Sequence, residues 1–144
     1  MRKHNNEGYL DLTAYGALSK IEKGEKAIRR TAAFRPLVYI CSPYAGDIEK
    51  NTKNARRYSR FAVTRNAIPF APHLLMPQYM DEKTERWLAM LMNSVFIGKC
   101  DELWVFGNVI SDGMSYEIEK AENMGKVIRY FTENLKEVDC NGIR

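Results

Sequence analysis

Cysteine is scarce in this sequence, and its scarcity excludes a fold held by disulfides. The 144 residues contain three cysteines, Cys41, Cys100 and Cys140, with no Cys-x-x-Cys pair and no cysteine and histidine spacing of a zinc site. This usage indicates a reducing compartment, and because Cys41 and Cys100 lie in or beside apolar runs, we interpret them as packing residues. We therefore expect a cytoplasmic protein that binds no metal and needs no cofactor.

Long apolar runs are missing as well. No stretch approaches the roughly 20 residues that a membrane-spanning helix needs. The polar start Met-Arg-Lys-His-Asn-Asn also lacks the apolar core of a signal peptide. We expect no membrane association and no export.

A strong charge of one sign is the third absence. The chain has 22 basic and 18 acidic side chains, a formal net charge of +4. That excess is too small to argue for nucleic acid, so we expect no nucleic-acid partner. Much of it falls in the first 35 residues, which we interpret as a solvated helical face. A weaker alternative is that this segment docks nucleic acid or a partner protein.

What the sequence does contain is a strand and helix pattern with the composition of one globular domain, 45% hydrophobic and 28% charged. Short β-branched and aromatic runs predict strands, and three- and four-residue spacing of apolar side chains predicts helices between them. The predicted strands are Leu37–Cys41, Ala67–Ala71, Glu102–Gly107 and Lys126–Phe131. The predicted helices run from Asp47 or Asn51 to Asn66, from Lys83 to Lys99 and from Met114 to Met124.

Alternating strands and helices predict an α/β fold with a single parallel sheet, flavodoxin-like or Rossmann-like, in the strand order 2-1-3-4 with flanking helices. Residues 36–135 form this domain. Residues 1–35 are an N-terminal helical extension, with one or two helices interrupted at Gly24, and residues 136–144 are a C-terminal tail. In that strand order a ligand binds beyond the carboxyl ends of strands one and three, where the loops Ser42–Asp47 and Gly107–Gly113 lie.

Glu117 is the residue that this topology places at the ligand site. It lies one turn into the helix whose start faces the predicted crevice. A helix N-terminus stabilises an ionised carboxylate by about 0.3–1 kcal/mol, so we expect a charged, nucleophilic side chain. The alternative is a glutamate that complements the helix dipole on an exposed face, an interpretation that suits Glu119 and Glu122 better.

Several motifs follow one another from about Pro36 to Phe131: Val38-Tyr39-Ile40-Cys41 with a small-residue turn, Asn93 and Ile97 before Cys100-Asp101, Ser111-Asp-Gly-Met-Ser-Tyr-Glu117, Ala121 and Gly125-Lys126. In this order they resemble the nucleoside 2-deoxyribosyltransferase superfamily. The resemblance is greatest to uncharacterised members, often associated with phages or prophages, which share the opening Tyr-Ile-Cys-Ser-Pro-Tyr and the strand Cys-Asp-Glu-Leu-Trp-Val-Phe-Gly.

The resemblance implies cleavage or transfer of an N-glycosidic bond. Glu117 matches the glutamate that attacks the anomeric carbon and holds the glycosyl unit covalently. Tyr39 matches a tyrosine that orients this glutamate. Ser111 matches a position that binds phosphate in the monophosphate-hydrolysing branch, although a loop serine that bonds to nearby backbone is an equal alternative. The resemblance also implies a homo-oligomer, because members build their sites at subunit interfaces.

Two positions depart from the family pattern. Asn93 stands where the enzymes place an aspartate that helps to protonate the leaving base, a transfer typically worth about 10²–10⁴-fold that an amide cannot perform. Pro43 and Ala45 stand in the first loop where the monophosphate branch has serine and arginine. Arg56, Arg86 or a neighbouring subunit can compensate for the missing cation.

The remaining candidate ligand-binding positions lie in the two loops, after strand two and at the start of the last helix. His73 can act as an acid or hydrogen-bond donor, and Tyr44 can stack on a base. Trp87 and Trp104 are predicted to be core residues, and Asp101 is predicted to be structural. The candidate ligand-binding set is Ser42, Tyr44, Gly46, His73, Asn93, Ser111, Gly113 and Met114.

The sequence therefore leaves two functions open. The first is an enzyme, a hydrolase or a transferase, that acts on a nucleoside, a deoxynucleoside or its 5′-monophosphate. The second is a nucleotide-binding protein that has kept the pocket without efficient chemistry and serves as a sensor or sequestering protein. The retained Glu117 and Tyr39 favour the first, and Asn93 favours the second.

Overall fold

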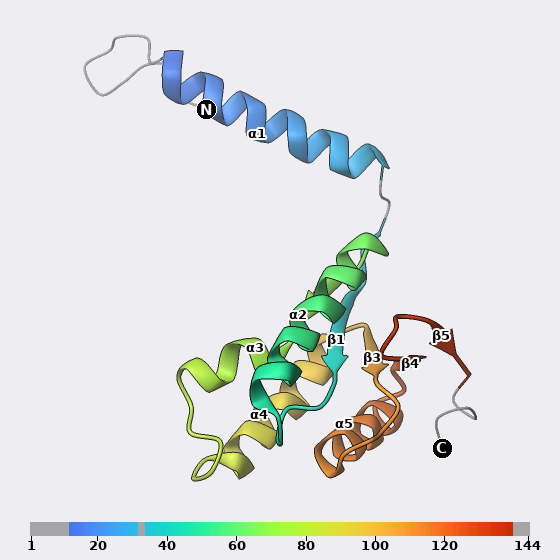
Figure 1. Ribbon diagram of the computed structural model, residues 1–144. Helices are drawn as coiled ribbons and strands as arrows, with labels where there is room; N and C mark the ends of the chain where they lie inside the picture. The colour runs from blue at the N-terminus through green and yellow to red at the C-terminus, as the bar shows by residue number, and fades with distance from the viewer. Residues whose placement is uncertain (1–11, 32–33, 140–144) are drawn as a thin grey trace. The chain divides into compact units, whose positions relative to one another are not determined.

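The computed structural model describes residues 12–31 and 34–139 (Figure 1). It divides into two compact units, Met1–Phe34 and Arg35–Arg144. In the first unit, the 20-residue helix α1 (Leu12–Thr31) exposes Leu18 and Ile21. The helix continues through Gly24, so of the one or two helices expected in this segment the structure has one, because a single glycine weakens a helix without breaking it.

The second unit is built on a five-stranded sheet in the order β2-β1-β3-β4-β5. Neighbouring strands are parallel as far as β4, and β5 is antiparallel to β4. The α/β fold with strand order 2-1-3-4 is confirmed, and β5 adds an edge strand within the segment that we assigned to the tail. The strands are β1 (Leu37–Cys41), β2 (Ile68–Phe70), β3 (Glu102–Phe106), β4 (Val127–Phe131) and β5 (Glu137–Val138).

Helices cover both faces of the sheet (Figure 1). Strand side chains alternate between the faces, so Val38 and Ile40 pack with α2 while Tyr39 and Cys41 pack with α4 and α5. Two short helical turns, α3 and η1, follow β2. The bounds are α2 (Ile48–Thr64), α3 (Pro72–Leu75), η1 (Met76–Gln78), α4 (Arg86–Lys99) and α5 (Asp112–Asn123).

The loop after β1 is fixed by two side chains at the start of α2. Asp47 is the N-cap residue, and its carboxylate accepts a hydrogen bond of 3.1 Å from the backbone N–H of Lys50. Asn51 does not cap the helix. Its amide instead donates to the backbone oxygens of Tyr44 and Ala45, at 3.0 and 3.1 Å. These bonds hold the first predicted ligand loop in place.

The buried face of α4 differs from the expectation. Ala89, Asn93 and Ile97 are buried, whereas Trp87 is 70% exposed and Leu91 is 54% exposed. Trp87 is therefore not a core residue, in contrast to Trp104, which is 1% exposed. Because α4 is apolar around most of its circumference, periodicity alone cannot identify the side that packs on the sheet.

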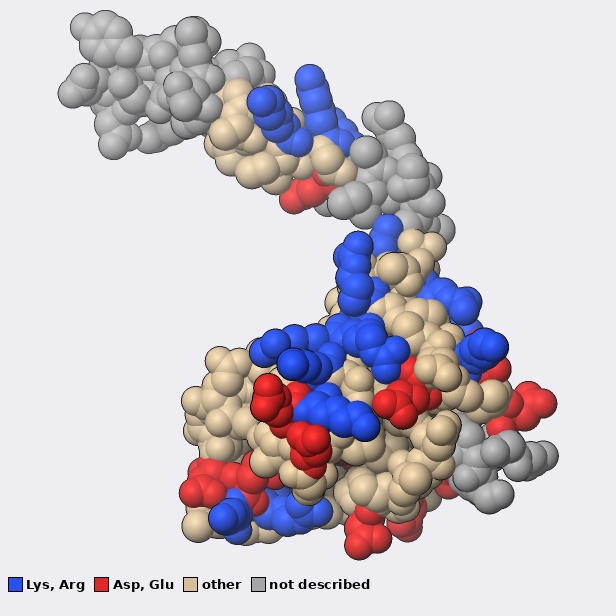
Figure 2. Space-filling view, in the orientation of Figure 1, with Lys and Arg blue, Asp and Glu red and all other residues tan. Residues whose placement is uncertain are grey.

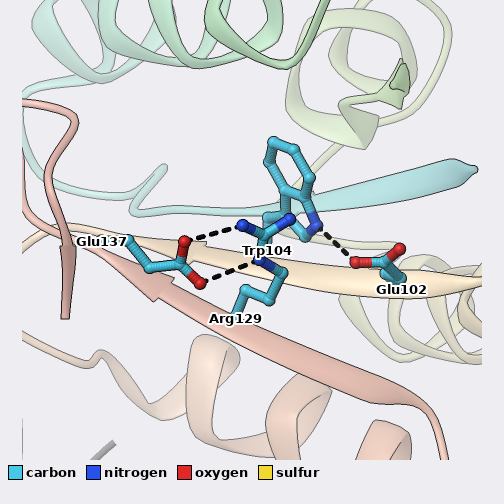
Figure 3. Close-up of polar contacts among 4 residues, drawn as sticks. All are labelled: Glu102, Trp104, Arg129 and Glu137. Atoms are coloured by element: carbon cyan, nitrogen blue, oxygen red, sulfur yellow. Dashed lines mark hydrogen bonds and ion pairs between the residues drawn. The ribbon is translucent and has the colours of Figure 1, made fainter. Parts of the chain in front are cut away.

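A polar network joins β5 to the sheet (Figure 3). The Arg129 guanidinium donates to both carboxylate oxygens of Glu137, at 2.9 and 2.7 Å, and lies 5.0 Å from the ring centre of Trp104. The indole N–H of Trp104 donates to Glu102. The ion pair raises the pKa of Arg129 and lowers the pKa of Glu137. At the N-terminal ends of β1 and β3, the Asp101 carboxylate accepts from the Leu37 N–H at 2.8 Å, which is a structural role.

Nowhere in residues 12–31 and 34–139 is a helix long and apolar enough to cross a bilayer. Cys41 and Cys100 are buried free thiols, and Cys140 lies outside the described residues.

Candidate functional site

A cleft of about 270 Å³ lies beyond the carboxyl ends of β1 and β3. The chain leaves β1 towards α2 on one face of the sheet and leaves β3 towards α5 on the other, which makes this pair of strands the topological switch point. The residues that line the cleft are Ser42, Pro43, Tyr44, Ala45, His73, Glu82, Arg86, Ser111, Asp112, Gly113, Met114 and Glu117.

Glu117 is the buried acid of this cleft. Helix α5 begins at Asp112, two residues earlier than expected, so Glu117 lies in its second turn and is 5% exposed. Its Oε2 has no hydrogen-bond partner among the described residues. Burial raises the pKa of Glu117 from 4.5 to about 8.

The expectation of a charged Glu117 at neutral pH is therefore wrong. The helix dipole acts within the first turn and stabilises a carboxylate by about 1 kcal/mol at most. Removing a carboxylate from water costs several kcal/mol. The Cys41 thiol and the Tyr39 hydroxyl face the carboxyl and lower its pKa, but burial outweighs both. Glu117 is mainly protonated at neutral pH in the unliganded protein.

Tyr39 lies beneath Glu117 and does not line the cleft. It is completely buried, and its hydroxyl oxygen lacks a hydrogen-bond partner in the described part of the chain. Burial and then the Glu117 charge raise its pKa well above 10, so the hydroxyl keeps its proton. Beside it, the Cys41 thiol donates to the Met114 backbone oxygen at 3.9 Å. Tyr39 can orient or support Glu117 but cannot contact a ligand in this conformation.

Asn93 lies in a side pocket of about 60 Å³ that Glu117, Arg86 and Tyr116 also line. The side chain projects from α4 and is 8% exposed, and its Oδ1 is buried without a partner among the residues described. A buried amide oxygen left unpaired costs about 1–3 kcal/mol. Asn93 Oδ1 and Glu117 Oε2 are thus buried polar atoms without a partner among the described residues, in side chains that line these pockets.

His73 and Tyr44 form one wall of the cleft. The His73 Nε2–H donates to the Ser42 backbone oxygen at 3.1 Å, and its ring lies 4.9 Å from the Tyr44 ring at an interplanar angle of 30°. Burial lowers the pKa of His73 from 6.5 to about 4. The ring is therefore neutral at physiological pH, with Nδ1 as an acceptor, and it cannot serve as the general acid that the sequence suggested.

The start of α5 forms the opposite wall. The Ser111 hydroxyl is the N-cap and accepts a hydrogen bond from the Met114 N–H at 3.2 Å, which is the local backbone role. Asp112, Gly113 and Met114 follow it along the cleft. Gly46, with φ of +97°, lies in the turn before α2 and outside this lining.

Arg86 is the only arginine among the described residues that line this cleft. An Nη of Arg86 lies 3.8 Å from the position that a Cβ on Gly113 would occupy, so the cation lies against the α5 N-terminus. In the described chain no acid lies within ion-pair distance of it. Arg56, the other candidate, is exposed on α2. The sequence did not identify Glu82 and Asp112 as lining residues, because each looks like an ordinary surface acid.

A larger cleft of about 630 Å³ borders the other flank of α5 and contains no candidate site residue. Its lining is mainly apolar, with Val109, Ile110, Ile118 and Tyr130, and the exposed Glu119 and Glu122 border it. The described residues contain no group of histidine, cysteine and acidic side chains that can hold a metal ion. The smaller cleft holds the buried polar groups, and we assign the candidate site to it.

A family model described as "Domain of unknown function (DUF7768)" matches residues 36–131. Among solved structures, the 2-deoxyribosyltransferase of Bacillus psychrosaccharolyticus has a TM-score of 0.56 at 15% identity, over 73% of this chain and 78% of that chain. The 2-desoxiribosyltransferase of Leishmania mexicana has a TM-score of 0.49 at 17% identity, over 67% of this chain and 64% of that chain. No curated protein matches the sequence. At 15% identity the first similarity shows a shared fold alone.

Proposed function

Because the chain belongs to the DUF7768 family, whose description assigns no activity, its chemistry follows from its own cleft, and we propose that it cleaves or transfers the N-glycosidic bond of a nucleoside, a deoxynucleoside or its 5′-monophosphate. Glu117 is the nucleophile, and Tyr39 supports it. The buried carboxyl of Glu117 at the switch point, whose Oε2 has no hydrogen-bond partner among the described residues, carries this proposal. The fold shared with a 2-deoxyribosyltransferase is consistent with it.

The reaction has two steps. An ionised Glu117 oxygen attacks the anomeric carbon, the bond from that carbon to the base nitrogen breaks, and the base leaves with the electron pair and takes up a proton from solvent. Water or a second base then attacks the same carbon, loses a proton to solvent, and displaces the Glu117 carboxylate. The Tyr39 hydroxyl lies beneath the carboxyl and stabilises its charged form.

The experiment that tests this function measures free base. Each deoxynucleoside and each deoxynucleoside 5′-monophosphate is incubated with the full chain, with and without an acceptor base, and the products are separated by chromatography. We expect base release from at least one substrate. Saturable binding without base release from any of them would leave only the second function.

That second function is a ligand-binding protein without turnover, and Asn93 favours it. An amide in the pocket can hydrogen-bond a base but cannot protonate it as it leaves, and the neutral His73 cannot replace it. Asn93→Asp supplies a carboxyl to the same pocket. If turnover is limited by the missing acid, this variant releases base faster than the wild-type chain.

Arg86 is expected to select for a 5′-phosphate. A hydrogen bond to a charged group contributes about 1.5–3 kcal/mol, so Arg86→Met should weaken binding of a deoxynucleoside 5′-monophosphate by about 10- to 100-fold. Binding of the matching deoxynucleoside should hardly change. Calorimetric titration with both ligands measures the difference, and Lys83→Met, an exposed cation outside the cleft, is the control. Equal losses for the two ligands would show that Arg86 does not read the phosphate.

The exposed apolar face of α4 supports the homo-oligomer that we also propose. Trp87, Leu91 and Val95 follow one another at four-residue spacing and are 70%, 54% and 54% exposed. Arg86 and Asn93 on the same helix line the candidate site, so a second copy on this face would lie beside it. Such a stripe in contact with water is typical of an interface.

Replacing Trp87 and Leu91 by lysine should convert the oligomer to a monomer. Interface hot spots contribute about 2 kcal/mol or more each, so the double variant should dissociate at least about 100-fold more readily. Sedimentation velocity over a concentration series measures this. Val127→Lys changes an equally exposed apolar residue on β4 and should leave the assembly intact. A wild-type chain that sediments as a monomer throughout the series would contradict the proposal.

Origin in a phage or prophage and a cytoplasmic location stay predictions.

A further inference from the structure

The exposed face of α2 concentrates positive charge. The helix carries five basic side chains and one acidic one, a net charge of +4 that equals the net charge of the entire chain. Figure 2 shows basic side chains gathered over α2, which faces the viewer. The basic residues are Lys50, Lys53, Arg56, Arg57 and Arg60.

Three of these side chains form a row, which we call the basic row: Lys53, Arg56 and Arg60. Their spacing of three and four residues places them on one side of the helix over a length of about 10 Å. All three are exposed, whereas Ala55 and Tyr58 on the opposite side are buried against the sheet. The basic row therefore faces solvent as a continuous cationic ridge.

Acidic neighbours neutralise little of this ridge. The one ion pair recorded along it joins Lys53 to Glu49 at 3.8 Å, and both side chains are more than 70% exposed. Arg57 is engaged elsewhere, donating to the Glu133 backbone oxygen at 2.8 Å. Like charges at this spacing destabilise a helix by about 0.2–0.5 kcal/mol per pair. Alternating signs are typical of a solvent-exposed helix face, and the basic row does not alternate.

We propose that the basic row binds the phosphate backbone of nucleic acid without reading its sequence. Backbone binding requires only cations at the surface, and arginine guanidinium groups match phosphate geometry. The interaction is independent of the chemistry at Glu117. It reverses the expectation from net charge, because the average over the chain conceals a local excess on one helix face.

The alternatives to nucleic acid fit this face less well. A helix that lies on a membrane must insert its apolar side, but that side of α2 is packed on the sheet, and its exposed large apolar residues are Ile48 and Val63 near its two ends. A protein partner usually needs aromatic anchors, and the basic row contains none. The α2 face thus offers charge and little else.

The start of α2 lies beside the candidate site. Lys50, Asn51 and Asn54 line a hollow of about 250 Å³ that also includes Asn108. Pro43 belongs to the lining of both this hollow and the Glu117 cleft. The basic row itself lines neither the hollow nor the cleft, so its binding of a phosphate backbone is a property of the outer face of α2.

The test compares three charge-reversal variants of the full chain with equal net charge. The first is K53E/R56E/R60E on α2, the second is K20E/K23E/K26E on α1, and the third is the control K83E/K99E/K136E, whose lysines are exposed elsewhere. The probes are fluorescein-labelled single-stranded DNA, duplex DNA and single-stranded RNA, each of about 20 nucleotides, followed by fluorescence anisotropy between about 50 and 200 mM KCl.

We expect wild-type affinity for duplex DNA to fall by about 40-fold or more over that salt range, as three or more phosphate contacts require. The α2 variant should bind at least about tenfold more weakly at low salt and lose most of that salt dependence, while the control binds like the wild type. Equal loss in the control, a loss confined to the α1 variant, or no wild-type binding at low salt would overturn the proposal. So would tighter binding to phosphatidylserine vesicles or to polyglutamate than to DNA.

Discussion

Replacing Glu117 with glutamine should abolish base release. The amide has nearly the same size and keeps the buried site filled, but it cannot form the covalent bond to the anomeric carbon. Loss of a catalytic nucleophile commonly lowers turnover by about 10³-fold or more. Chromatographic quantification of free base under single-turnover conditions measures the loss. Ligand affinity should remain within a few-fold of the wild type, because the pocket keeps its shape.

Glu119→Gln is the matched control for this variant. Glu119 lies on the same helix, is exposed, and lines the larger cleft on the other flank of α5. Its replacement removes the same functional group and should leave base release unchanged. Base release by the Glu117→Gln variant at a rate near that of the wild type would exclude the nucleophile role, even if the chain proves to be an N-glycosidase.

Base release should rise with pH up to about pH 8 and then level off. Only the ionised carboxyl attacks, and with the pKa of Glu117 at about 8, the ionised fraction falls tenfold for each pH unit below that value. The rate at pH 6 should therefore be about one hundredth of the plateau rate. A profile of kcat/KM against pH measures the midpoint. Tyr39→Phe removes a hydroxyl that lowers the pKa, so it should move the midpoint to higher pH. A rate that falls as the pH rises to 8 would contradict the assignment.

The same raised pKa makes stability depend on pH. The pKa of the Glu117 carboxyl is ordinarily 4.5 and rises to about 8 in the fold. The folded state therefore holds this proton more tightly than the unfolded state. The resulting stabilisation is complete below pH 4.5 and disappears as the pH rises to 8, a change on the order of 5 kcal/mol. About 3 kcal/mol of this change falls between pH 6 and pH 9, and urea unfolding at these two pH values measures that part. The Glu117→Gln variant should lack this part of the pH dependence.

The sequence predicted the central strands closely because their signal is local. Leu37–Cys41 and Glu102–Phe106 are continuous apolar runs bounded by polar turns, as strands covered on both faces require. The strand order followed from the alternation of strands and helices. The short segments α3, η1 and β5 were not predicted, since two to four residues carry too little periodicity to be recognised.

The candidate site was predictable in position more than in chemistry. Parallel topology alone predicted that Ser42 and Glu117 lie together beyond the carboxyl ends of β1 and β3. The protonation of Glu117 and the neutrality of His73 depend on how deeply each side chain is covered, a property of tertiary packing that no local pattern encodes. The buried side of α4 was likewise a tertiary choice, made between two apolar faces of one helix.

The two edge strands of the sheet, β2 and β5, limit how copies of this protein can aggregate. β2 has three residues, one of them Pro69, which lacks the N–H that an incoming strand would need, and β5 has only two residues. Neither edge offers the long row of free backbone groups that templates cross-chain pairing and fibril growth. Substitutions on the helix faces that leave the fold intact can therefore be explored with little risk that folded copies pair through the edges of the sheet.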